Sequence, residues 1–249
     1  MNGYNPFSLA GKTVLVTGAS SGIGRATAIE CSKMGATLVI TGRNEERLAE
    51  TFAQLEGSGH AQITADLTVQ EDIERLVASS PQLNGLVLCA GRSILSPLPF
   101  CTREKLDSVF NINFFSPVEV MRQLVRGKKI EKQGSIVAIV SIGGTGKFTP
   151  GNAMYGSSKA ALTSIVKYAA TELAAKKIRV NAINPGMVET PLIRRGMVTD
   201  EQYAADMSRY PLKRYGRPEE VAYAAIYLLS DAAAWVTGTS LVIDGGVTI

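Results

Sequence analysis

A tyrosine and a lysine stand four residues apart at the start of a helical pattern, in Tyr155-Gly156-Ser157-Ser158-Lys159. Residues i and i+4 share one face of a helix, so we expect Lys159 to lie beside Tyr155. Tyrosine has an ordinary pKa of about 10, and a neighbouring ammonium group favours the phenolate. Such a pair can give a proton to a carbonyl oxygen, or take one from an alcohol, while a hydride moves. Taken alone, the spacing is common by chance and usually marks only an ordinary helix surface.

A glycine-rich segment follows the first apolar run of the chain. The run Thr13–Thr17 leads into Gly18-Ala19-Ser20-Ser21-Gly22-Ile23-Gly24, where a helical pattern begins. Glycines at this spacing allow a sharp turn and a close approach of the backbone, and the first amides of the helix attract phosphate. We therefore predict a pyrophosphate-binding loop, with an ordinary strand-to-helix turn as the alternative. Its expected binding residues are Gly18, Ser20, Ser21, Gly22 and Gly24.

The end of the second expected strand indicates which dinucleotide would bind. In folds that bind NAD, an Asp or Glu about 20 residues beyond the glycines holds the ribose 2′-hydroxyl. Here that place reads Thr41-Gly42-Arg43-Asn44, so no carboxylate would repel a 2′-phosphate and Arg43 could pair with one. We therefore predict NADP(H) as the cofactor. The alternative is that Arg43 is a solvated residue at a helix entry.

Strand and helix patterns alternate along the chain. Several strand patterns are apolar throughout, as expected for strands buried on both faces of a parallel sheet. The alternation predicts one α/β domain over residues 1–249, a Rossmann-type doubly wound, seven-stranded parallel sheet with helices on both faces. The expected strands are Thr13–Thr17, Thr37–Thr41, Gln62–Thr64, Gly85–Cys89, Ile136–Val140, Val180–Ile183 and Ser240–Ile243. The expected helices are Ile23–Met34, Glu45–Leu55, Val69–Ala78, Arg103–Arg126, Met154–Ala175 and Pro218–Leu229, and we expect Gly186–Pro211 to be a mobile substrate-side segment with short helices.

Composition narrows the possible classes of protein. The chain has 249 residues, 45% of them hydrophobic, which suffices for one large core. No apolar run approaches the ~20 residues of a membrane-spanning helix, and the first eleven residues lack a secretory pattern, so we expect a cytoplasmic protein. The net charge of +4 is scattered and does not indicate nucleic-acid binding.

Histidine and cysteine usage argues against two common kinds of catalytic site. His60 is the only histidine, in a Gly/Ser-rich stretch typical of a surface turn, so neither a Ser-His-Asp hydrolase nor a histidine-ligated zinc is expected. Cys31, Cys89 and Cys101 are odd in number and show no C-x-x-C spacing. We interpret them as reduced thiols, and we predict no metal site.

Taken together, these motifs resemble the short-chain dehydrogenase/reductase family, in its single-domain branch. The resemblance covers essentially the whole chain and is closest to the 3-oxoacyl-acyl-carrier-protein reductase type, through Tyr210–Pro218 and Trp235-Val236-Thr237-Gly238. The matching motifs, in chain order, are Thr17–Gly24, Asp66-Leu67, Ala90-Gly91, Asn113, Ser141, Tyr155 with Lys159, Asn184-Pro185-Gly186 with Thr190, and Thr237-Gly238 with Asp244-Gly245-Gly246.

The resemblance implies a role for each polar group of the expected site. Tyr155 would be the general acid/base, Lys159 would lower its pKa and hold the nicotinamide ribose, and Ser141 would hold the substrate oxygen. Asn113 would hold a water molecule that links Lys159 to solvent. The resemblance also implies cofactor contacts, to the adenine, the nicotinamide or its carboxamide, from Ile23, Asp66, Leu67, Ala90, Gly91, Pro185, Gly186, Val188 and Thr190.

The chain departs from the family pattern in two places. Where the family usually has Asn-Asn-Ala-Gly, this chain has Leu88-Cys89-Ala90-Gly91, and Cys89 cannot make the hydrogen bonds of an amide. We expect Cys89 to be a small buried residue rather than a reactive thiol. The segment Val77–Leu86 is also shorter than usual, which would trim one helix end.

Two further features bear on partners. Basic residues follow two helices, at Arg126, Lys128, Lys129 and Lys132 and at Lys176, Lys177 and Arg179. In carrier-protein reductases, basic residues at comparable helix ends receive the acidic carrier, although the helix dipole favours cations there in any protein. The resemblance implies a homotetramer as well. Close helix contacts between subunits would fall at Ala160, Ala161, Ala169 and Ala170, which could equally pack inside one subunit.

The sequence thus predicts an oxidoreductase that transfers hydride between NADP(H) and a carbonyl or secondary alcohol, with a 3-oxoacyl thioester as one candidate substrate. A small ketone, a sugar or a steroid is an alternative substrate. A regulator that binds NADP(H) without turnover remains open, although the predicted set of catalytic residues is complete. A lyase or epimerase acting on a sugar nucleotide would be expected to have a larger C-terminal substrate region.

Overall fold

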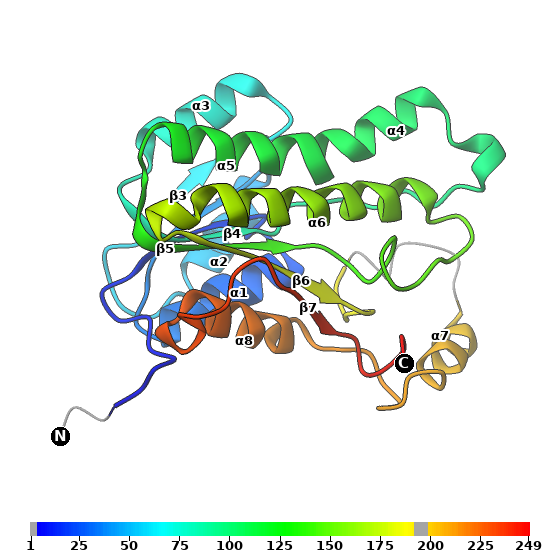
Figure 1. Cartoon of the computed structure of the whole chain (residues 1–249). Coiled ribbons are helices and arrows are strands. Elements are labelled where there is room, and N and C mark those ends of the chain that lie inside the picture. Colours follow the sequence, from blue (N-terminus) through cyan, green and yellow to red (C-terminus); the bar gives the residue numbers. More distant parts are fainter. Residues whose placement is uncertain (1–3, 192–198) are drawn as a thin grey trace.

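A parallel sheet of seven strands runs through the molecule (Figure 1). The computed structural model describes residues 4–191 and 199–249. The strand order is β3-β2-β1-β4-β5-β6-β7 and every neighbouring pair is parallel. The strands are β1 (Thr13–Thr17), β2 (Thr37–Gly42), β3 (Ala61–Thr64), β4 (Leu83–Leu88), β5 (Ile130–Ile139), β6 (Arg179–Pro185) and β7 (Ser240–Ile243).

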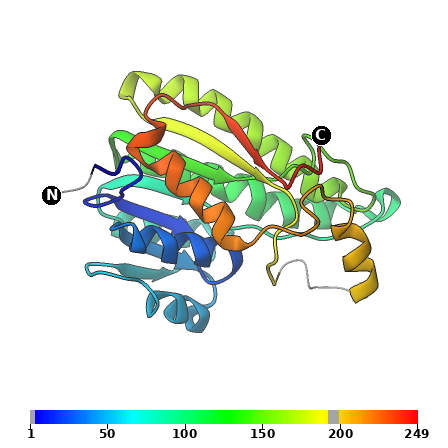
Figure 2. The ribbon, with the colours of Figure 1, turned by 90° about the horizontal axis from the view of Figure 1, so that it is seen from below.

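Helices cover both faces of this sheet, which confirms the predicted doubly wound α/β fold. One face packs against α3 (Gln70–Ser79), α5 (Ser116–Arg126) and α6 (Ala153–Leu173), through a core that includes Leu76, Leu124 and Leu162. The other face packs against α1 (Gly22–Lys33), α2 (Glu45–Phe52) and α8 (Pro218–Leu229). Figure 2 shows α8 lying beside α1 on this second face. The strand order reverses between β1 and β4, so the carboxyl ends of these two strands form the crevice where such sheets bind ligands.

The prediction of one regular helix over Arg103–Arg126 is wrong. Instead, α4 (Arg103–Phe110) passes into a π-helical turn over Asn111–Phe115 and then into α5. Proline has no amide hydrogen, so Pro117 cannot donate the ordinary α-helical bond to the carbonyl four residues back, which is that of Asn113. A wider turn at this point accommodates the missing bond, and π turns of this kind often lie at functional sites.

The other expected elements are present, with ends that differ by a few residues. β5 is the largest extension, because it begins at Ile130 rather than at Ile136. The first half of β5 contains the polar run Glu131-Lys132-Gln133, so no apolar pattern predicted a strand there. Its pairing with β4 also shifts register in this half. Helix α8 runs from Pro218 to Leu229 as predicted.

The segment Gly186–Pro211 holds a short helix, as expected. It is α7 (Asp200–Met207), and a capping box between Thr199 and Gln202 fixes its first turn. The rest of this prediction falls partly on residues 192–198, which lie outside the described residues.

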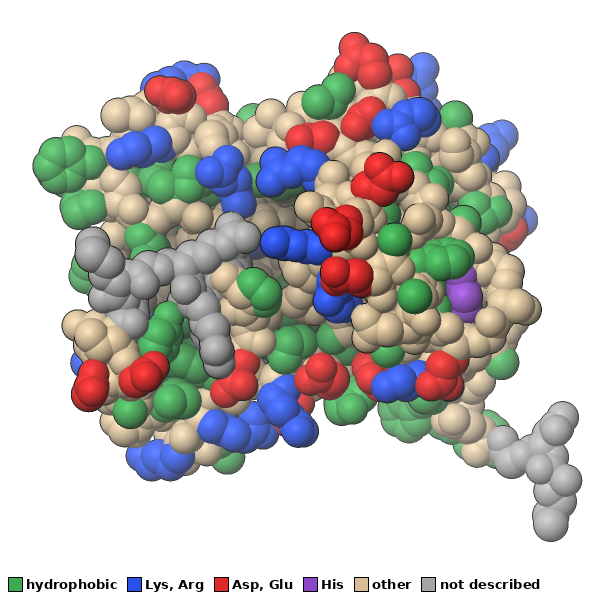
Figure 3. All heavy atoms as spheres, turned by 180° about the vertical axis from the view of Figure 1, so that it is seen from behind, with side chains coloured by type: hydrophobic (Ala, Val, Ile, Leu, Met, Phe, Trp, Pro, Cys, Tyr) green, Lys and Arg blue, Asp and Glu red, His purple; other side chains and the backbone are tan. Residues whose placement is uncertain are grey.

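Surface charge and the single histidine agree with the sequence analysis. Acidic and basic side chains are interspersed over the face that Figure 3 presents, so no single charge sign covers it. His60 is used by the scaffold: its Nδ1 accepts a hydrogen bond of 3.0 Å from the Leu38 amide. Within the described residues, no helix has both the length and the apolar character to cross a membrane. In the same part of the chain, no three His, Cys, Asp or Glu side chains gather closely enough to hold a metal ion.

Candidate active site

Three of the predicted catalytic side chains meet where β5 ends and α6 begins. Tyr155 and Lys159 lie on the first two turns of α6, and Ser141 lies two residues beyond the end of β5. The Ser141 hydroxyl lies near enough to the Tyr155 phenol to lower its pKa. The Lys159 side chain is buried, and its Nζ donates a 2.9 Å hydrogen bond to the Ile139 carbonyl and lies 6.0 Å from the centre of the Tyr155 ring. The sequence prediction that Lys159 lies beside Tyr155 is therefore confirmed.

Burial sets the protonation of both groups. It raises the pKa of Tyr155, and the nearby Ser141 hydroxyl only partly opposes this effect. Burial lowers the pKa of Lys159 to about 8. The sequence led us to expect a lowered pKa at Tyr155, whereas in the protein by itself desolvation is the largest cause and raises it. The Lys159 ammonium donates a hydrogen bond to the Ile139 carbonyl.

Asn113, the fourth predicted residue, lies on the π turn and is fully buried. Its Oδ1 accepts a hydrogen bond from the Arg92 amide, and its Nδ2 donates to the Arg92 carbonyl and to the Ser158 hydroxyl. The structure places it close to Lys159, because a Cβ added at Gly91 would lie 3.1 Å from Asn113 Oδ1 and 3.4 Å from Lys159 Nζ. Asn113 thus ties the loop after β4 to helix α6.

The loop that carries Ser141 is held by contacts that the sequence did not indicate. The Gly143 amide donates a 3.0 Å hydrogen bond to Ser141 Oγ, and Nδ2 of Asn184 donates one of 3.2 Å to the Ser141 carbonyl. Gly144 has a φ of +87°, and a Cβ there would lie 2.1 Å from the Gly156 carbonyl oxygen. This close approach fixes Ser141 relative to Tyr155. This arrangement is evident only from where Asn184, Gly144 and Gly156 lie in the folded protein.

The glycine-rich loop has the close packing that a dinucleotide site requires. Gly18 has a φ of +69°, and a Cβ there would lie 2.8 Å from Ala90 Cα. A Cβ at Gly24 would lie 2.3 Å from the Gly18 carbonyl oxygen, so α1 starts in direct contact with the turn. The N-cap residue Ser21 makes no side-chain capping bond, and the first turn of α1 has no acidic residue. The first amides of α1 therefore point out of the helix uncapped, where they can bind phosphate.

The residues predicted for the adenosine end also gather at one place. Arg43 is largely exposed, and its guanidinium lies 3.7 Å from the Asp66 carboxylate. Partial burial would raise the pKa of Asp66, but hydrogen bonds from Thr68 and the nearby Arg43 charge outweigh it, and the pKa lies below its usual value. Leu67 is buried beside it. At Gly42, an added Cβ would lie 3.1 Å from the Ser20 side chain, so the loop and the end of β2 are in contact.

The residues predicted for the nicotinamide end lie at the start of α1 and at the carboxyl end of β6. An added Cβ at Gly22 would lie 3.2 Å from the Thr190 methyl group, so the segment after β6 closes onto the glycine-rich loop. Val188 is buried and forms a bridge with Gly216. Pro185 ends β6, and the Gly186 amide donates to the Ile243 carbonyl. Ile23, and also Ala90 among the other expected cofactor contacts, are partly buried, and each packs against one of the two cores.

Thr17 holds the backbone at Cys89, whose side chain cannot make the hydrogen bonds of an amide. Its Oγ1 accepts hydrogen bonds from the amides of Cys89 and Ala90, at 3.0 and 3.3 Å. Cys89 is partly buried rather than fully buried as expected, and desolvation raises the pKa of its thiol to about 12, so the thiol stays protonated. The missing amide is a local change in the scaffold beside the catalytic group.

Comparison with known proteins extends these observations. A family model described as enoyl-(acyl carrier protein) reductase matches residues 18–248. Glucose 1-dehydrogenase of Gluconobacter oxydans is 36% identical over 249 residues, which cover 96% of this chain and 93% of the relative. The chain belongs to the short-chain dehydrogenase/reductase family. Members of this family are oxidoreductases that act on alcohol or carbonyl groups with a nicotinamide cofactor, so the predicted class of enzyme is confirmed.

Two other relatives are similar to this short-chain dehydrogenase/reductase over nearly its whole length. A 3-oxoacyl-acyl-carrier-protein reductase of Thermotoga maritima is 35% identical over 247 residues, covering 97% of this chain and 99% of the relative. The structure of a Pseudomonas aeruginosa RhlG/NADP active-site complex superimposes with a TM-score of 0.91 at 33% identity, covering 99% of this chain and all of the other. The glucose dehydrogenase and the 3-oxoacyl-acyl-carrier-protein reductase are named for different substrates, so membership in the family leaves the substrate open.

Proposed function

We propose that this protein interconverts a carbonyl and a secondary alcohol, with Tyr155 as the general acid/base and NADP(H) as the hydride carrier. The observation that carries the proposal is the meeting of Ser141, Tyr155 and Lys159 at the carboxyl edge of the sheet, next to the uncapped start of α1. We regard residues 1–249 as one such catalytic domain, and the cytoplasm as its expected location.

Each residue of the site has its own role in the reduction of a carbonyl. The nicotinamide, when bound, supplies the hydride that adds to the carbonyl carbon. Ser141 donates a hydrogen bond to the carbonyl oxygen as negative charge develops there, and Tyr155 gives that oxygen its proton. Lys159 holds its charge beside Tyr155 and the nicotinamide ribose. In the reverse direction, the phenolate of Tyr155 takes the proton from the alcohol.

Asn113 would connect Lys159 to solvent through a water molecule. Both amide hydrogens of Asn113 are used by Arg92 and Ser158, so the side chain has no further hydrogen to donate. Its main-chain carbonyl is the group that Pro117 deprives of an α-helical donor, and it is the better acceptor for this water. A proton would then pass from the water held by Asn113, through Lys159, back to Tyr155.

The preference for NADP(H) rests on Arg43. It lies at the end of β2, where NAD-specific folds place a carboxylate, and its side chain is 78% exposed and able to reach a 2′-phosphate. The RhlG structure, which resembles this chain throughout, is an NADP complex. The expected adenine contacts are Asp66 and Leu67. The expected contacts at the nicotinamide end are Ile23, Pro185, Gly186, Val188 and Thr190, and Ala90 and Gly91 are further expected cofactor contacts.

Apolar side chains on the loops after β4 and β5 favour a substrate with an apolar part over a free sugar. Leu95, Leu98 and Phe148 are 71%, 76% and 81% exposed. The two loops are joined, because the Ser96 amide donates a 2.8 Å hydrogen bond to the Gly151 carbonyl. Both follow strands at the carboxyl edge, where Tyr155 lies. A 3-oxoacyl thioester fits these side chains, and the Thermotoga maritima reductase acts on a substrate of that kind.

The basic residues proposed to receive an acyl carrier lie far from Tyr155 of the same chain. Lys176 and Lys177 follow the carboxyl end of α6, whose 21 residues span about 30 Å, whereas Tyr155 lies at its start. Lys128 and Lys129 likewise precede β5 at the amino edge of the sheet. A carrier docked there would serve the site of a neighbouring subunit, so this partner is proposed only together with the homotetramer.

The first experiment is an assay of nicotinamide absorbance with NADPH or NADH and a panel of ketones that includes an acetoacetyl thioester. We expect NADPH oxidation, and the Tyr155→Phe variant should lose about 10²- to 10⁴-fold in kcat while it still binds NADPH. A clear preference of the wild-type protein for NADH would overturn the role of Arg43. Tight NADPH binding without turnover on any ketone would favour the regulator over the reductase.

A further inference from the structure

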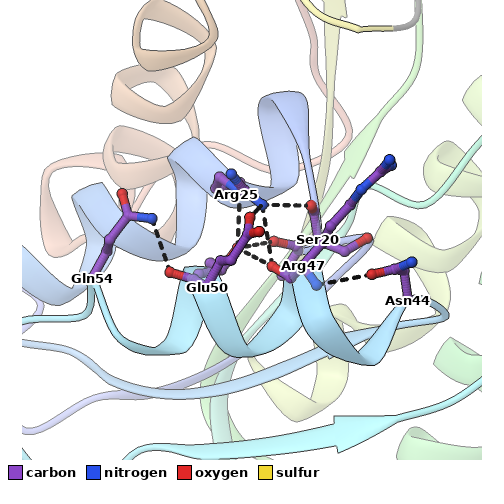
Figure 4. Close-up of polar contacts among 8 residues, drawn as sticks. Ser20, Arg25, Asn44, Arg47, Glu50 and Gln54 are labelled. Carbon is purple, nitrogen blue, oxygen red and sulfur yellow. Dashed lines mark hydrogen bonds and ion pairs between the residues drawn. The ribbon is translucent and has the colours of Figure 1, made fainter.

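The side chain of Arg25 connects three elements around the glycine-rich loop (Figure 4). It extends from α1 to α2, where its Nε donates a 3.0 Å hydrogen bond to the Thr51 hydroxyl. Its Nη2 has three acceptors within reach: the Ser20 carbonyl at 3.0 Å, the Arg47 carbonyl at 3.2 Å and the Glu50 carboxylate at 2.8 Å. Only one of these acceptors, Glu50, is a side chain. The guanidinium is thus built into the backbone of the loop and of α2.

Thr51 extends this network to the preceding residue of the loop. It is fully buried, and its Oγ1 lies 2.9 Å from the Ala19 carbonyl and 3.1 Å from the Arg47 carbonyl, with one hydrogen to donate. Arg25 uses the lone pair of this hydroxyl, so the hydrogen of Thr51 is directed at these carbonyls. Two successive carbonyls, of Ala19 and Ser20, are therefore drawn toward α2.

The orientation of these carbonyls fixes the amides that follow them. In a planar trans peptide, the C=O and the next N–H point in opposite directions. Because the Ala19 and Ser20 carbonyls point toward α2, the amides of Ser20 and Ser21 point away from α2. They face the same space as the uncapped first amides of α1, where phosphate oxygens would bind.

We propose that Arg25 is a positioning residue that holds the amides of Ser20 and Ser21 in the orientation that binds the pyrophosphate of the dinucleotide. This inference rests on the proposed function, because it requires a dinucleotide at this loop. Glu50 holds the guanidinium from its solvent side, and the Arg25 side chain is only 29% exposed. A cavity of about 470 Å³ lies beside this network, lined by Ser20, Ser21, Gly22, Arg25, Arg47 and other residues of the same elements.

The test measures binding rather than turnover. NADP⁺, ADP-ribose and adenosine 2′-monophosphate are titrated by calorimetry into the wild-type protein and into Arg25→Met, Arg25→Lys and Thr51→Val. Arg122→Met is the matched control, because Arg122 also pairs with a helical glutamate, Glu119, on α5, which lies on the other face of the sheet.

We expect Arg25→Met to raise the Kd of NADP⁺ and of ADP-ribose at least tenfold and to leave the Kd of adenosine 2′-monophosphate within twofold. That last ligand lacks a pyrophosphate, so it does not need the oriented amides. Arg25→Lys and Thr51→Val should give smaller changes in the same direction, and Arg122→Met should give none. Thr51→Val also keeps the experiment informative if Arg25→Met does not fold.

Three results would decide against the inference or against its basis. An unchanged Kd of ADP-ribose in both Arg25→Met and Thr51→Val would overturn the role of Arg25. An equal loss for all three ligands, with a fall in Tm, would reduce Arg25 to a residue that only stabilises the fold. If the wild-type protein binds neither NADP⁺ nor ADP-ribose, the proposed function fails first, and the network is then a feature of the scaffold.

Discussion

Lys159 carries a charge in a place where charge is costly. Its side chain is 4% exposed, and among the described residues its Nζ donates a hydrogen bond to one main-chain carbonyl, that of Ile139. Desolvation therefore lowers its pKa to about 8, whereas the pKa of Tyr155 is raised. At neutral pH, the protein by itself holds a protonated phenol beside a lysine that is close to losing its proton. This is the state required for donation of a proton to a carbonyl.

These protonation states predict the pH dependence of carbonyl reduction. We expect kcat/KM to be flat below about pH 7 and to fall well above pH 8 by about tenfold per pH unit, the slope of one deprotonation, because Lys159 loses its charge while Tyr155 remains protonated. In Lys159→Arg the guanidinium keeps its charge, so the falling limb should move to higher pH. Lys167→Arg, an exposed lysine on the same helix, is the control. A falling limb that stays near pH 8 in Lys159→Arg would contradict the assignment.

The same shift has a thermodynamic consequence that does not depend on activity. Between about pH 8 and 10.5, the unfolded chain holds more protons at Lys159 than the folded protein does, so this residue makes stability rise with pH. Below about pH 8 the cost of the buried charge is present in full. We therefore expect the Tm of the wild-type protein to gain on that of Lys159→Met as the pH rises from 7 to 10. Differential scanning fluorimetry would measure it, and a constant difference in Tm would argue against a perturbed lysine.

At the scale of elements, close backbone contacts rather than side chains hold the site together. The start of α1 touches the turn before it at Gly24, and the loop after β5 touches α6 at Gly144 and Gly156. A Cβ at Gly24 or at Gly144 would meet a carbonyl oxygen, and a Cβ at Gly156 would lie 3.2 Å from the Gly144 nitrogen. The elements therefore approach more closely than residues with a Cβ allow.

Gly24→Ala tests this packing. Alanine favours a helix more than glycine does, but its Cβ would lie 2.3 Å from the Gly18 carbonyl oxygen, so the loop must shift. We expect the Kd of the dinucleotide to rise more than tenfold and the Tm to fall. Gly216→Ala is the control, because the nearest atom to its Cβ would lie 3.7 Å away, and it should keep both values. Unchanged dinucleotide binding in Gly24→Ala would show that the loop tolerates the shift.

At the scale of the whole molecule, one edge of the sheet carries exposed apolar side chains. β7 is an edge strand, and Val242 on it is 49% exposed. Trp235 before this strand and Ile249 after it are both fully exposed. Exposed apolar side chains at a sheet edge are a liability that proteins usually cover. In contrast, Ala170, one of the alanines expected at a subunit contact, is buried in the core of its own chain, whereas Ala160, Ala161 and Ala169 are only partly buried.

These side chains provide a test of the predicted homotetramer. We expect the wild-type protein to sediment with four times the 26.5 kDa mass of the chain. Trp235→Glu combined with Val242→Lys should give a smaller species, because charges would have to be buried at the contact. Tyr4→Glu, which changes an equally exposed aromatic residue near the N-terminus, should not. A monomeric wild-type protein would contradict the tetramer and, with it, the proposed carrier partner.

The sequence by itself determined the fold class and the members of the candidate site. Apolar strands alternating with helical patterns allow few arrangements other than a doubly wound sheet, and Tyr155 and Lys159 must share a face because they are one helical turn apart. The tertiary structure decided the features of the site that depend on packing and on contacts between distant parts of the chain. Some of these features join residues that are distant in the sequence, as do the bond from Asn184 to Ser141 and the network around Arg25 and Thr51. Others depend on how the chain packs, as do the π turn at Asn113 and the raised pKa of Tyr155. No local pattern encodes such contacts, because they arise only when the sheet brings its loops together.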